Sequence, residues 1–330
     1  MKPRTRAAIG VGMLLVGTAL LGLLGRIGTP KSTDSAPDVP SGELGTITET
    51  DYFTIQDDAT GTLLRVPDDE FLAGAVVCEM PLSYADEALK AQAVAAYTVY
   101  DYQRAQRRAA GRPGADFTCD TAKWLLYTTE SQMRARWGAQ YDEYRARLDT
   151  LLAGLAGQRL TYRGDRVLAV YSAISGGTSE ASAEVWGGAL DYLTAVDSSW
   201  DREAPGYASE VRVSAEEFRA KICEIAPDCA LSTRPADWIG ACTRTAAGTV
   251  RRIALGDAAV TGEQLRTAFG LRSANFTLTY TDGSFCFAVR GYGHGVGMSQ
   301  FGANYMAQHG ADYRAILAHY YPGTEIYANS

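Results

Sequence analysis

The sequence predicts a mixed α+β fold, in which a helical and β-sheet main domain carries a smaller inserted α/β subdomain and follows a transmembrane anchor. Three observations lead to this prediction. Apolar residues recur at helical spacing in 84–110, and 130–156 has the charged outer face of another long helix. Alternating residues at 276–290, interrupted by Asp282-Gly283, predict a β-hairpin. An uncharged run from Ala7 to Gly25 is long enough to cross a bilayer.

The N-terminal segment predicts where the chain resides. A basic leader precedes the uncharged run and places the N-terminus inside the cell. Because Gly17 and Ala19 lie within the run and no convincing cleavage site follows it, we favour an uncleaved signal anchor over a cleaved signal peptide. The expected organisation is a single-pass anchor in the cell membrane at 1–26, a flexible linker at 27–48, and an extracytoplasmic domain at 49–330 with the inserted subdomain at about 205–280.

Composition and charge exclude several functional classes. A net charge of −7 over 330 residues argues against a nucleic-acid partner. Three histidines and the absence of a Cys-x-x-Cys motif leave little from which to build a metal site, so we expect no cofactor. The six cysteines lie on the exported side, where disulfides form, and pairs are plausible among the last four, Cys223, Cys229, Cys242 and Cys286. Cys78 is alternatively a buried thiol.

The first half of the main domain reads as strands followed by long helices. Alternation with a turn at Gly61 predicts two strands. Pro67 opens a helix with an acidic first turn, and Pro81 ends that helix near Met80. The expected elements are strands within Tyr52–Val66, helices at Pro67–Met80, Tyr84–Ala110 and Glu130–Ala156, and a strand at Arg166–Ile174.

The second half predicts shorter elements. Ser214 is expected to cap one helix, and Thr261 to start another that ends at Gly270. The other expected elements are a strand at Val250–Leu255, hairpin strands at Phe276–Tyr280 and Ser284–Arg290, and closing helices at Gln300–His309 and Asp312–Tyr321.

Glu79 is the first candidate for chemistry. It falls in the last turn of the helix that Pro81 ends, among apolar residues such as Val76 and Val77. The negative end of the helix dipole and an apolar setting both disfavour the ionised form, so we expect a raised pKa. A carboxylic acid that is protonated near neutral pH suits general-acid chemistry on a sugar oxygen. The alternative is a solvated glutamate at a helix end.

Two further segments carry candidate binding residues. Ser175-Gly176-Gly177 follows a strand, where glycines let a ligand approach the backbone; the alternative is an ordinary turn. It is not a phosphate loop, because no Lys-Ser/Thr follows. Beyond it lie Trp186, Tyr192 and Trp200, which suit stacking on sugar rings or, alternatively, core packing.

The segment from Gly291 to Gln300 has glycine at alternate positions, which is costly unless a ligand or another backbone comes close. His294 and Gln300 are its polar candidates, and Ser299 is either a ligand contact or only the N-cap of the next helix.

Other catalytic schemes find less support. No GxSxG or SxxK motif supports a serine nucleophile. A two-carboxylate glycosidase would need a second acid besides Glu79, and none of the candidates has a comparable apolar setting. These candidates are Glu180, Glu184, Asp191 and Asp197.

Three blocks of the sequence together resemble the stage II sporulation protein D family, which also includes amidase enhancers. They are Val77–Ala96, Val170–Asp201 and Arg290–Gly323, and a weaker fourth piece is TGEQLRTAFGLRSANF. The resemblance runs in order over roughly residues 50 to 327, and the glycine–histidine block GYGHGVGMSQFG is highly specific.

The resemblance implies a catalytic domain with a substrate groove that acts as a lytic transglycosylase on peptidoglycan glycan strands without stem peptides. Glu79 would protonate the glycosidic oxygen between MurNAc and GlcNAc and then take the proton of the C6 hydroxyl, which closes a 1,6-anhydro ring without a second carboxylate. The partners it implies are an amidase/endopeptidase, stage II sporulation protein P, and a membrane scaffold during engulfment. The residues expected to contact substrate are Lys90, Gln92, Tyr171, Ser175, Gly176, Gly177, Trp186, Tyr192, His294, Ser299 and Gln300.

The sequence departs from the family pattern at two places. Family members often carry an arginine where Tyr97 stands. Some members bind zinc through cysteines and a histidine in the loop that matches Cys119–Tyr127, where only Cys119 remains, so we predict no metal.

Two other functions stay open. The first is a non-catalytic glycan-binding activator of a cell-wall amidase, and the second is a cell-wall enzyme unrelated to sporulation.

Overall fold

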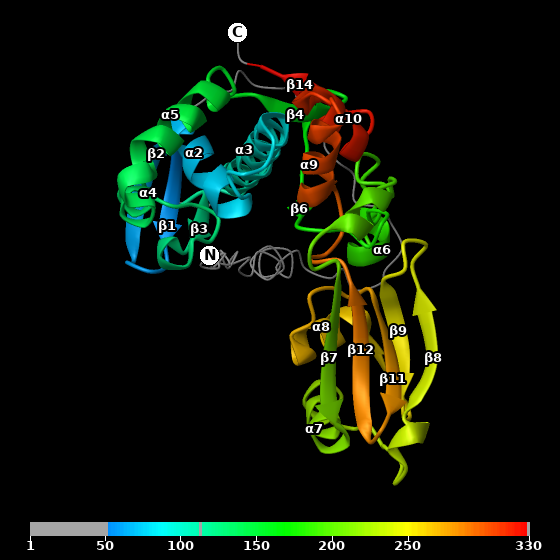
Figure 1. Ribbon diagram of the computed structural model, residues 1–330. Coiled ribbons are helices and arrows are strands. Elements are labelled where there is room, and N and C mark those ends of the chain that lie inside the picture. The colour runs from blue at the N-terminus through cyan, green and yellow to red at the C-terminus, as the bar shows by residue number, and fades with distance from the viewer. Residues whose placement is uncertain (1–51, 112–113, 329–330) are drawn as a thin grey trace, which may run out of the picture.

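The computed structural model describes residues 52–111 and 114–328, which form two lobes joined end to end (Figure 1). The first lobe combines the chain up to α6 with the C-terminal segment from β13 onward, and the second lobe comprises the chain from β7 to β12. The predicted anchor and linker at 1–48 lie outside the described residues. Within the described residues, no helix has the length and apolar character that crossing a membrane requires.

The first lobe is built around one long helix, α3 (Asp86–Ala109), which packs against α2, α5, α9, α10 and β4. Its other elements are β1 (Tyr52–Asp57), β2 (Thr62–Pro67), α2 (Asp68–Glu79), β3 (Phe117–Cys119), α4 (Glu130–Trp137), α5 (Tyr141–Leu152), β4 (Arg159–Tyr162), β5 (Asp165–Arg166), β6 (Tyr171–Ser172), α6 (Ser182–Trp186), β13 (Met298–Ser299), α9 (Gln300–Gln308), α10 (Tyr313–Tyr320) and β14 (Glu325–Tyr327). Small residues such as Ala91 and Ala95 are fully buried on α3, so its neighbours approach the helix axis closely.

Three short sheets complete the first lobe. They have the strand orders β2-β1-β3, β13-β6 and β14-β4-β5. The parallel pair β6–β13 sets Met298 opposite Tyr171 and Ser299 opposite Ser172. This pairing brings two of the predicted site segments, distant in sequence, to the same place.

Two predicted elements of the first lobe are wrong in extent. The helix expected over Glu130–Ala156 is two helices, because Gly138 adopts a positive φ of 52° and ends α4. The strand expected over Arg166–Ile174 is reduced to β5 and β6 with irregular chain between them. The side chains of an apolar run can be buried without a continuous ladder of strand hydrogen bonds, and here they pack against helices.

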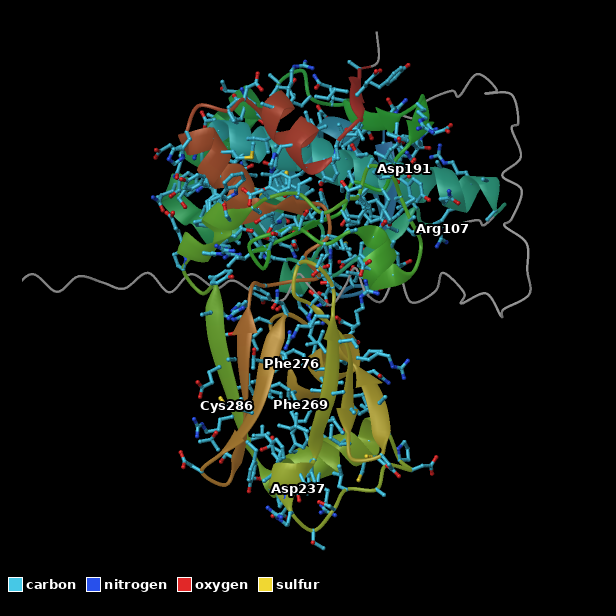
Figure 2. The ribbon with its side chains drawn as sticks, turned by 90° about the vertical axis from the view of Figure 1, so that its right-hand side faces the viewer. Arg107, Asp191, Asp237, Phe269, Phe276 and Cys286 are labelled. Atoms are coloured by element: carbon cyan, nitrogen blue, oxygen red, sulfur yellow. The ribbon has the colours of Figure 1, made fainter. Side chains whose placement is uncertain are left out.

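The second lobe consists of β7 (Ala208–Ser214), α7 (Ala215–Ile225), β8 (Ile239–Arg244), β9 (Val250–Leu255), β10 (Ala258–Thr261), α8 (Gly262–Phe269), β11 (Phe276–Thr281) and β12 (Ser284–Arg290). Its sheets have the orders β11-β12-β7 and β10-β9-β8. A separate aromatic core lies within the lobe, in which Phe218 stacks on Phe285 at 3.9 Å between ring centroids. Figure 2 shows Phe269 and Phe276 of this core, and Asp237 at the end of the lobe far from the first lobe.

Local signals predicted this lobe well. The hairpin turn has positive φ at both Asp282 and Gly283, the geometry that a two-residue turn requires. Ser214 accepts a hydrogen bond from the backbone N–H of Glu217, and Gly270 ends α8 in the left-handed conformation. These predictions are confirmed.

The six cysteines, all within the described residues, are free thiols. The pairs expected among the last four are not formed; these residues lie on or after α7, on β8 and on β12. Cys286 lies on β12, the middle strand of its sheet, with its side chain partly exposed (Figure 2).

Candidate active site

Glu79 is the last residue of α2, which ends where Met80 turns to an extended conformation before Pro81. Only 8% of Glu79 is exposed to solvent. Burial raises the pKa of its carboxyl to about 7, and a hydrogen bond from Gln300 acts in the opposite direction. The predicted rise in pKa is therefore confirmed, and the alternative of a solvated glutamate is wrong.

Two glutamine side chains bind this carboxyl into a small polar cluster. The Nε2 of Gln300, the first residue of α9, lies 3.3 Å from Oε2 of Glu79 and 3.3 Å from Oε1 of Gln92 on α3. Both glutamines were predicted as site residues; Gln300 bonds to Glu79 directly, and Gln92 joins the cluster through Gln300. Three elements thus meet at one carboxyl, because α3 packs against both α2 and α9.

Two tyrosines surround the same carboxyl. The hydroxyls of Tyr100 on α3 and Tyr171 on β6 interact with each other, and the charge of ionised Glu79 would raise the pKa of both. Burial raises the pKa of each phenol well above its usual value, so both stay protonated. Tyr171 was predicted at the site. Tyr100 was not predicted as a site residue, since the apolar spacing over 84–110 does not distinguish a packing tyrosine from a site tyrosine.

Asp201 is a site-adjacent residue that the sequence reasoning missed. Its side chain is fully buried, and its Oδ2 accepts a hydrogen bond of 2.7 Å from the backbone N–H of Ser175. Burial raises the pKa of Asp201, and hydrogen bonds that include one from Ser299 oppose the rise. Ser299 also caps α9 by accepting from the N–H of Gly302. Asp201 therefore links the loop after β6 to the helix that begins with Gln300. Its position at the end of the Val170–Asp201 block was the available signal.

The glycines of 291–297 do not form a strand with two faces. All four have positive φ, and a Cβ at Gly291 or Gly297 would meet the backbone carbonyl of Ser175 or Val170. Another backbone therefore accounts for Gly291 and Gly297, whereas a Cβ at Gly293 or Gly295 would meet the side chain of Ser172 or Glu180. Ser175 and Gly177 lie in the loop after β6 that packs against this glycine segment. Within that loop, the hydroxyl of Ser175 accepts a hydrogen bond from the N–H of Gly177. Gly176 faces the side chain of Asn275 from the second lobe.

His294 and Trp186 form a second pair beside this segment, with ring centroids 5.3 Å apart. Nδ1 of His294 accepts a hydrogen bond from the N–H of Val296, so the proton of the neutral ring is on Nε2. Burial lowers the pKa of His294 to about 3, which keeps the imidazole neutral at physiological pH. His294 is therefore a hydrogen-bonding residue here and not a proton-transfer residue near pH 7.

Two predicted site residues are engaged elsewhere. Lys90 forms an ion pair of 2.7 Å with Glu87 on its own helix. Tyr192 is buried, and its hydroxyl accepts from the N–H of Leu168 at 3.0 Å, which fits the alternative of core packing.

The four candidates for a second acid have partners other than Glu79. Glu180 is 3% exposed and accepts hydrogen bonds from the Thr245 hydroxyl at 2.9 Å and the Thr249 N–H at 3.3 Å, both in the second lobe. Glu184 pairs with Arg251, Asp191 with the hydroxyl of Tyr162, and Asp197 with Ser199. Among the described residues, no other carboxylate contributes to the pKa shift of Glu79.

The two departures from the family pattern also have structural explanations. Tyr97 is buried in α3, and its hydroxyl donates to Asp68 at 2.5 Å, so it offers no contact to a ligand. The loop after β3 does not suit zinc, because Cys119 is its one thiol and the nearby carboxylate of Asp57 is engaged by Thr60 and Thr121. The described residues hold no cluster of three or more His, Cys, Asp or Glu that could bind a metal.

Comparisons with known proteins identify relatives of this chain. The family model described as "Stage II sporulation protein" matches residues 56–162. Stage II sporulation protein D of Bacillus amyloliquefaciens is 34% identical over 264 residues, which cover 79% of this chain and 74% of that protein. Stage II sporulation protein D of Bacillus subtilis (strain 168) is 30% identical over 269 residues, which cover 81% of this chain and 76% of that protein. An amidase enhancer of the same organism is 26% identical over 306 residues, 77% of this chain and 40% of that protein.

Proposed function

We propose, from the premise that the chain belongs to the stage II sporulation protein D family, that it is a lytic transglycosylase of peptidoglycan. Its substrate would be a glycan strand whose stem peptides have been removed, cleaved between MurNAc and GlcNAc. The observation that carries this proposal is the single buried carboxyl of Glu79 with a pKa of about 7.

The reaction can be written around this one carboxyl. Protonated Glu79 transfers its proton to the glycosidic oxygen as the bond from C1 of MurNAc to that oxygen breaks. The resulting carboxylate then takes the proton from the C6 hydroxyl of the same MurNAc, whose oxygen forms the new bond to C1. Glu79 ends in its starting state, and the products are a new GlcNAc end and a 1,6-anhydro-MurNAc end.

The surroundings of Glu79 support this reaction over hydrolysis. A hydrolase of the usual kind places a second carboxylate about 5 to 10 Å away to activate water or attack the sugar. Each of the four candidate acids has partners elsewhere in the described chain, and the tyrosines beside Glu79 remain neutral. An intramolecular hydroxyl nucleophile needs no such group.

The setting of the enzyme in the cell is part of the proposal. The chain would sit in the cytoplasmic membrane through a single span with its N-terminus inside, and its described lobes would lie outside the cytoplasm. Its partners would be peptidoglycan glycan strands, a stage II sporulation protein P amidase/endopeptidase that removes stem peptides, and a membrane scaffold during engulfment.

A second candidate function is a non-catalytic activator of a cell-wall amidase. The similarity to a protein described as an amidase enhancer favours it. In that case the cluster around Glu79 would bind glycan without turning it over, and the raised pKa would be a by-product of burial.

The Glu79→Gln variant of the full-length protein separates the two. Mass spectrometry of products from peptide-free glycan strands should detect anhydro-muramyl ends with the wild type and none with the variant, while strand binding in a pull-down is retained. Persistent product release by the variant would exclude Glu79 as the acid. Binding without product release by the wild type would establish the activator.

A further inference from the structure

The amide of Gln300 lies between two acceptors, and this position determines which way the amide is oriented. One acceptor is Oε2 of Glu79 and the other is Oε1 of Gln92, both 3.3 Å from the same nitrogen. An NH2 group has two hydrogens, so Nε2 of Gln300 can serve both acceptors at once. The reversed amide would set its oxygen against the carbonyl oxygen of Gln92, which is unfavourable.

Burial makes this orientation consequential. Gln92 is fully buried and Gln300 is 5% exposed, so water does not compete freely for either amide. Oε1 of Glu79 and Nε2 of Gln92 have no hydrogen-bond partner within the described residues. The cluster therefore satisfies one oxygen of the carboxyl and leaves the other one buried without a partner in the described residues.

We propose that Gln92 is a positioning residue that fixes the donor orientation of Gln300, and that this amide relay assigns different roles to the two oxygens of Glu79. Oε2 accepts from Gln300 throughout, and Oε1 carries the transferable proton. The inference rests on the proposed function for the identity of the proton's destination, but the relay itself is a property of the free protein.

The two roles follow from the chemistry of the carboxyl. An oxygen that already accepts from an N–H is the poorer site for a proton, so the proton of neutral Glu79 resides on Oε1. That proton moves to the glycosidic oxygen, and Oε1 later receives the proton of the C6 hydroxyl, so one oxygen serves both steps. Gln300 meanwhile stabilises the negative charge on the intervening carboxylate.

The titratable groups that face Glu79 do not compete for this role. They are Cys78 of α2, Tyr100 of α3 and Tyr171 of β6. Burial raises the pKa of all three well above its usual value, so each is neutral when Glu79 titrates. A change in the titration of Glu79 after an amide substitution is therefore attributable to the amides.

The test is pH-difference infrared spectroscopy of the full-length protein, in which the C=O band of a protonated buried carboxyl reports Glu79 and disappears in Glu79→Gln. Gln300→Met removes the donor and should raise the titration midpoint by about one pH unit, since a hydrogen bond to a charged group favours the ionised form by that order. Gln92→Met does not touch Glu79, yet it frees Gln300 to turn its oxygen toward the protonated carboxyl and should raise the midpoint in the same direction.

The double variant gives the decisive comparison. If Gln92 acts through Gln300, then Gln92→Met/Gln300→Met should have the midpoint of Gln300→Met alone. Additive shifts, or an unshifted midpoint in a folded Gln92→Met protein, would overturn the relay. Thr98→Val is the matched control: it removes a buried hydroxyl from the same helix, one that donates to Val94 and accepts from Leu160, and should leave the midpoint unchanged.

A measurement on the wild-type protein tests the relay even if the variants do not fold. With glutamine labelled at the side-chain carbonyl carbon, the wild-type spectrum should contain amide bands that change with the same midpoint as the Glu79 carboxyl. The absence of any such band would overturn the proposal. A shifted midpoint together with absent glycan turnover would refute the proposed function and leave the relay standing.

Discussion

Two buried glutamates in this molecule have opposite surroundings. Glu79 ends α2 inside the first lobe, where one of its oxygens meets Gln300 and the other has no partner within the described residues. Glu180 lies at the junction of the lobes, where its carboxylate accepts from Thr245 and Thr249 and its backbone pairs with the glycine segment through Gly295. Both are less than a tenth exposed.

The difference shows that the surroundings of a buried glutamate decide whether it can act as an acid or serves to hold two parts of the structure together. Donors around Glu180 compensate the loss of water, so its side chain joins the two lobes through hydrogen bonds. Glu79 has too few donors for its charge, so it is held as an acid that can give up a proton. Each of the following experiments tests this contrast.

The largest expected effect is on turnover. Glu79→Gln should lower the rate of glycan cleavage by about 10²- to 10⁴-fold, the usual contribution of a general acid. Glu180→Gln keeps an amide oxygen for Thr245 and Thr249 and should retain the rate per folded molecule. Both variants would be assayed by release of anhydro-muramyl products; equal losses would erase the distinction between the two glutamates.

Substitutions in the glycine segment at the junction should have the next largest effect, which is on the free energy of unfolding. Gly297→Ala places a Cβ against the carbonyl of Val170 at a φ of +73°, so we expect a loss of about 4 kcal/mol in unfolding free energy or failure to fold. Gly310→Ala is the matched control, since its φ is also positive and nothing lies within 4 Å of its Cβ. Denaturant unfolding would compare them, and similar costs would contradict the role assigned to close backbone packing.

The pH dependence of stability should distinguish Glu79 next. Its folded pKa of about 7 exceeds the ordinary value of 4.5, so the folded state binds more protons within that window. Stability contributed by the protonated acid is therefore lost as the pH rises from 4.5 to about 7, by about 3 kcal/mol. The difference in unfolding free energy between wild type and Glu79→Gln, measured against pH, isolates this contribution. A flat difference would show that Glu79 is not the buried acid described.

The smallest expected effect is the loss of stability when the hydrogen bonds of Glu180 between the lobes are removed. Glu180→Ala leaves the hydroxyl of Thr245 and the N–H of Thr249 without their acceptor, at a cost of about 2 kcal/mol. Thermal unfolding should report this loss with turnover per folded molecule unchanged. A variant as stable as the wild type would mean that water replaces the carboxylate and that the junction is held by other contacts.

Local sequence signals predicted much of the fold and part of the site. Pro81 set the end of α2 and hence the place of Glu79, and Asp282-Gly283 set the hairpin turn. Continuous elements were overestimated at Glu130–Ala156 and Arg166–Ile174, because helical or apolar runs do not reveal where packing interrupts them. The role of Asp201 went unnoticed, because its place at the end of the Val170–Asp201 block does not reveal that its carboxylate binds both the backbone of Ser175 and the side chain of Ser299.

The sequence by itself determined that Glu79 would be an acid at a helix end, because a proline, a dipole and apolar neighbours all act within a few residues. Only the tertiary structure decided which polar groups reach that acid. Gln300 and Gln92 lie more than 200 positions apart along the chain and meet through the packing of α9 on α3. The same packing gave the glycine segment a backbone for its neighbour and Glu180 two donors. Contacts between distant segments depend on the closed core as a whole, and no window of sequence contains them.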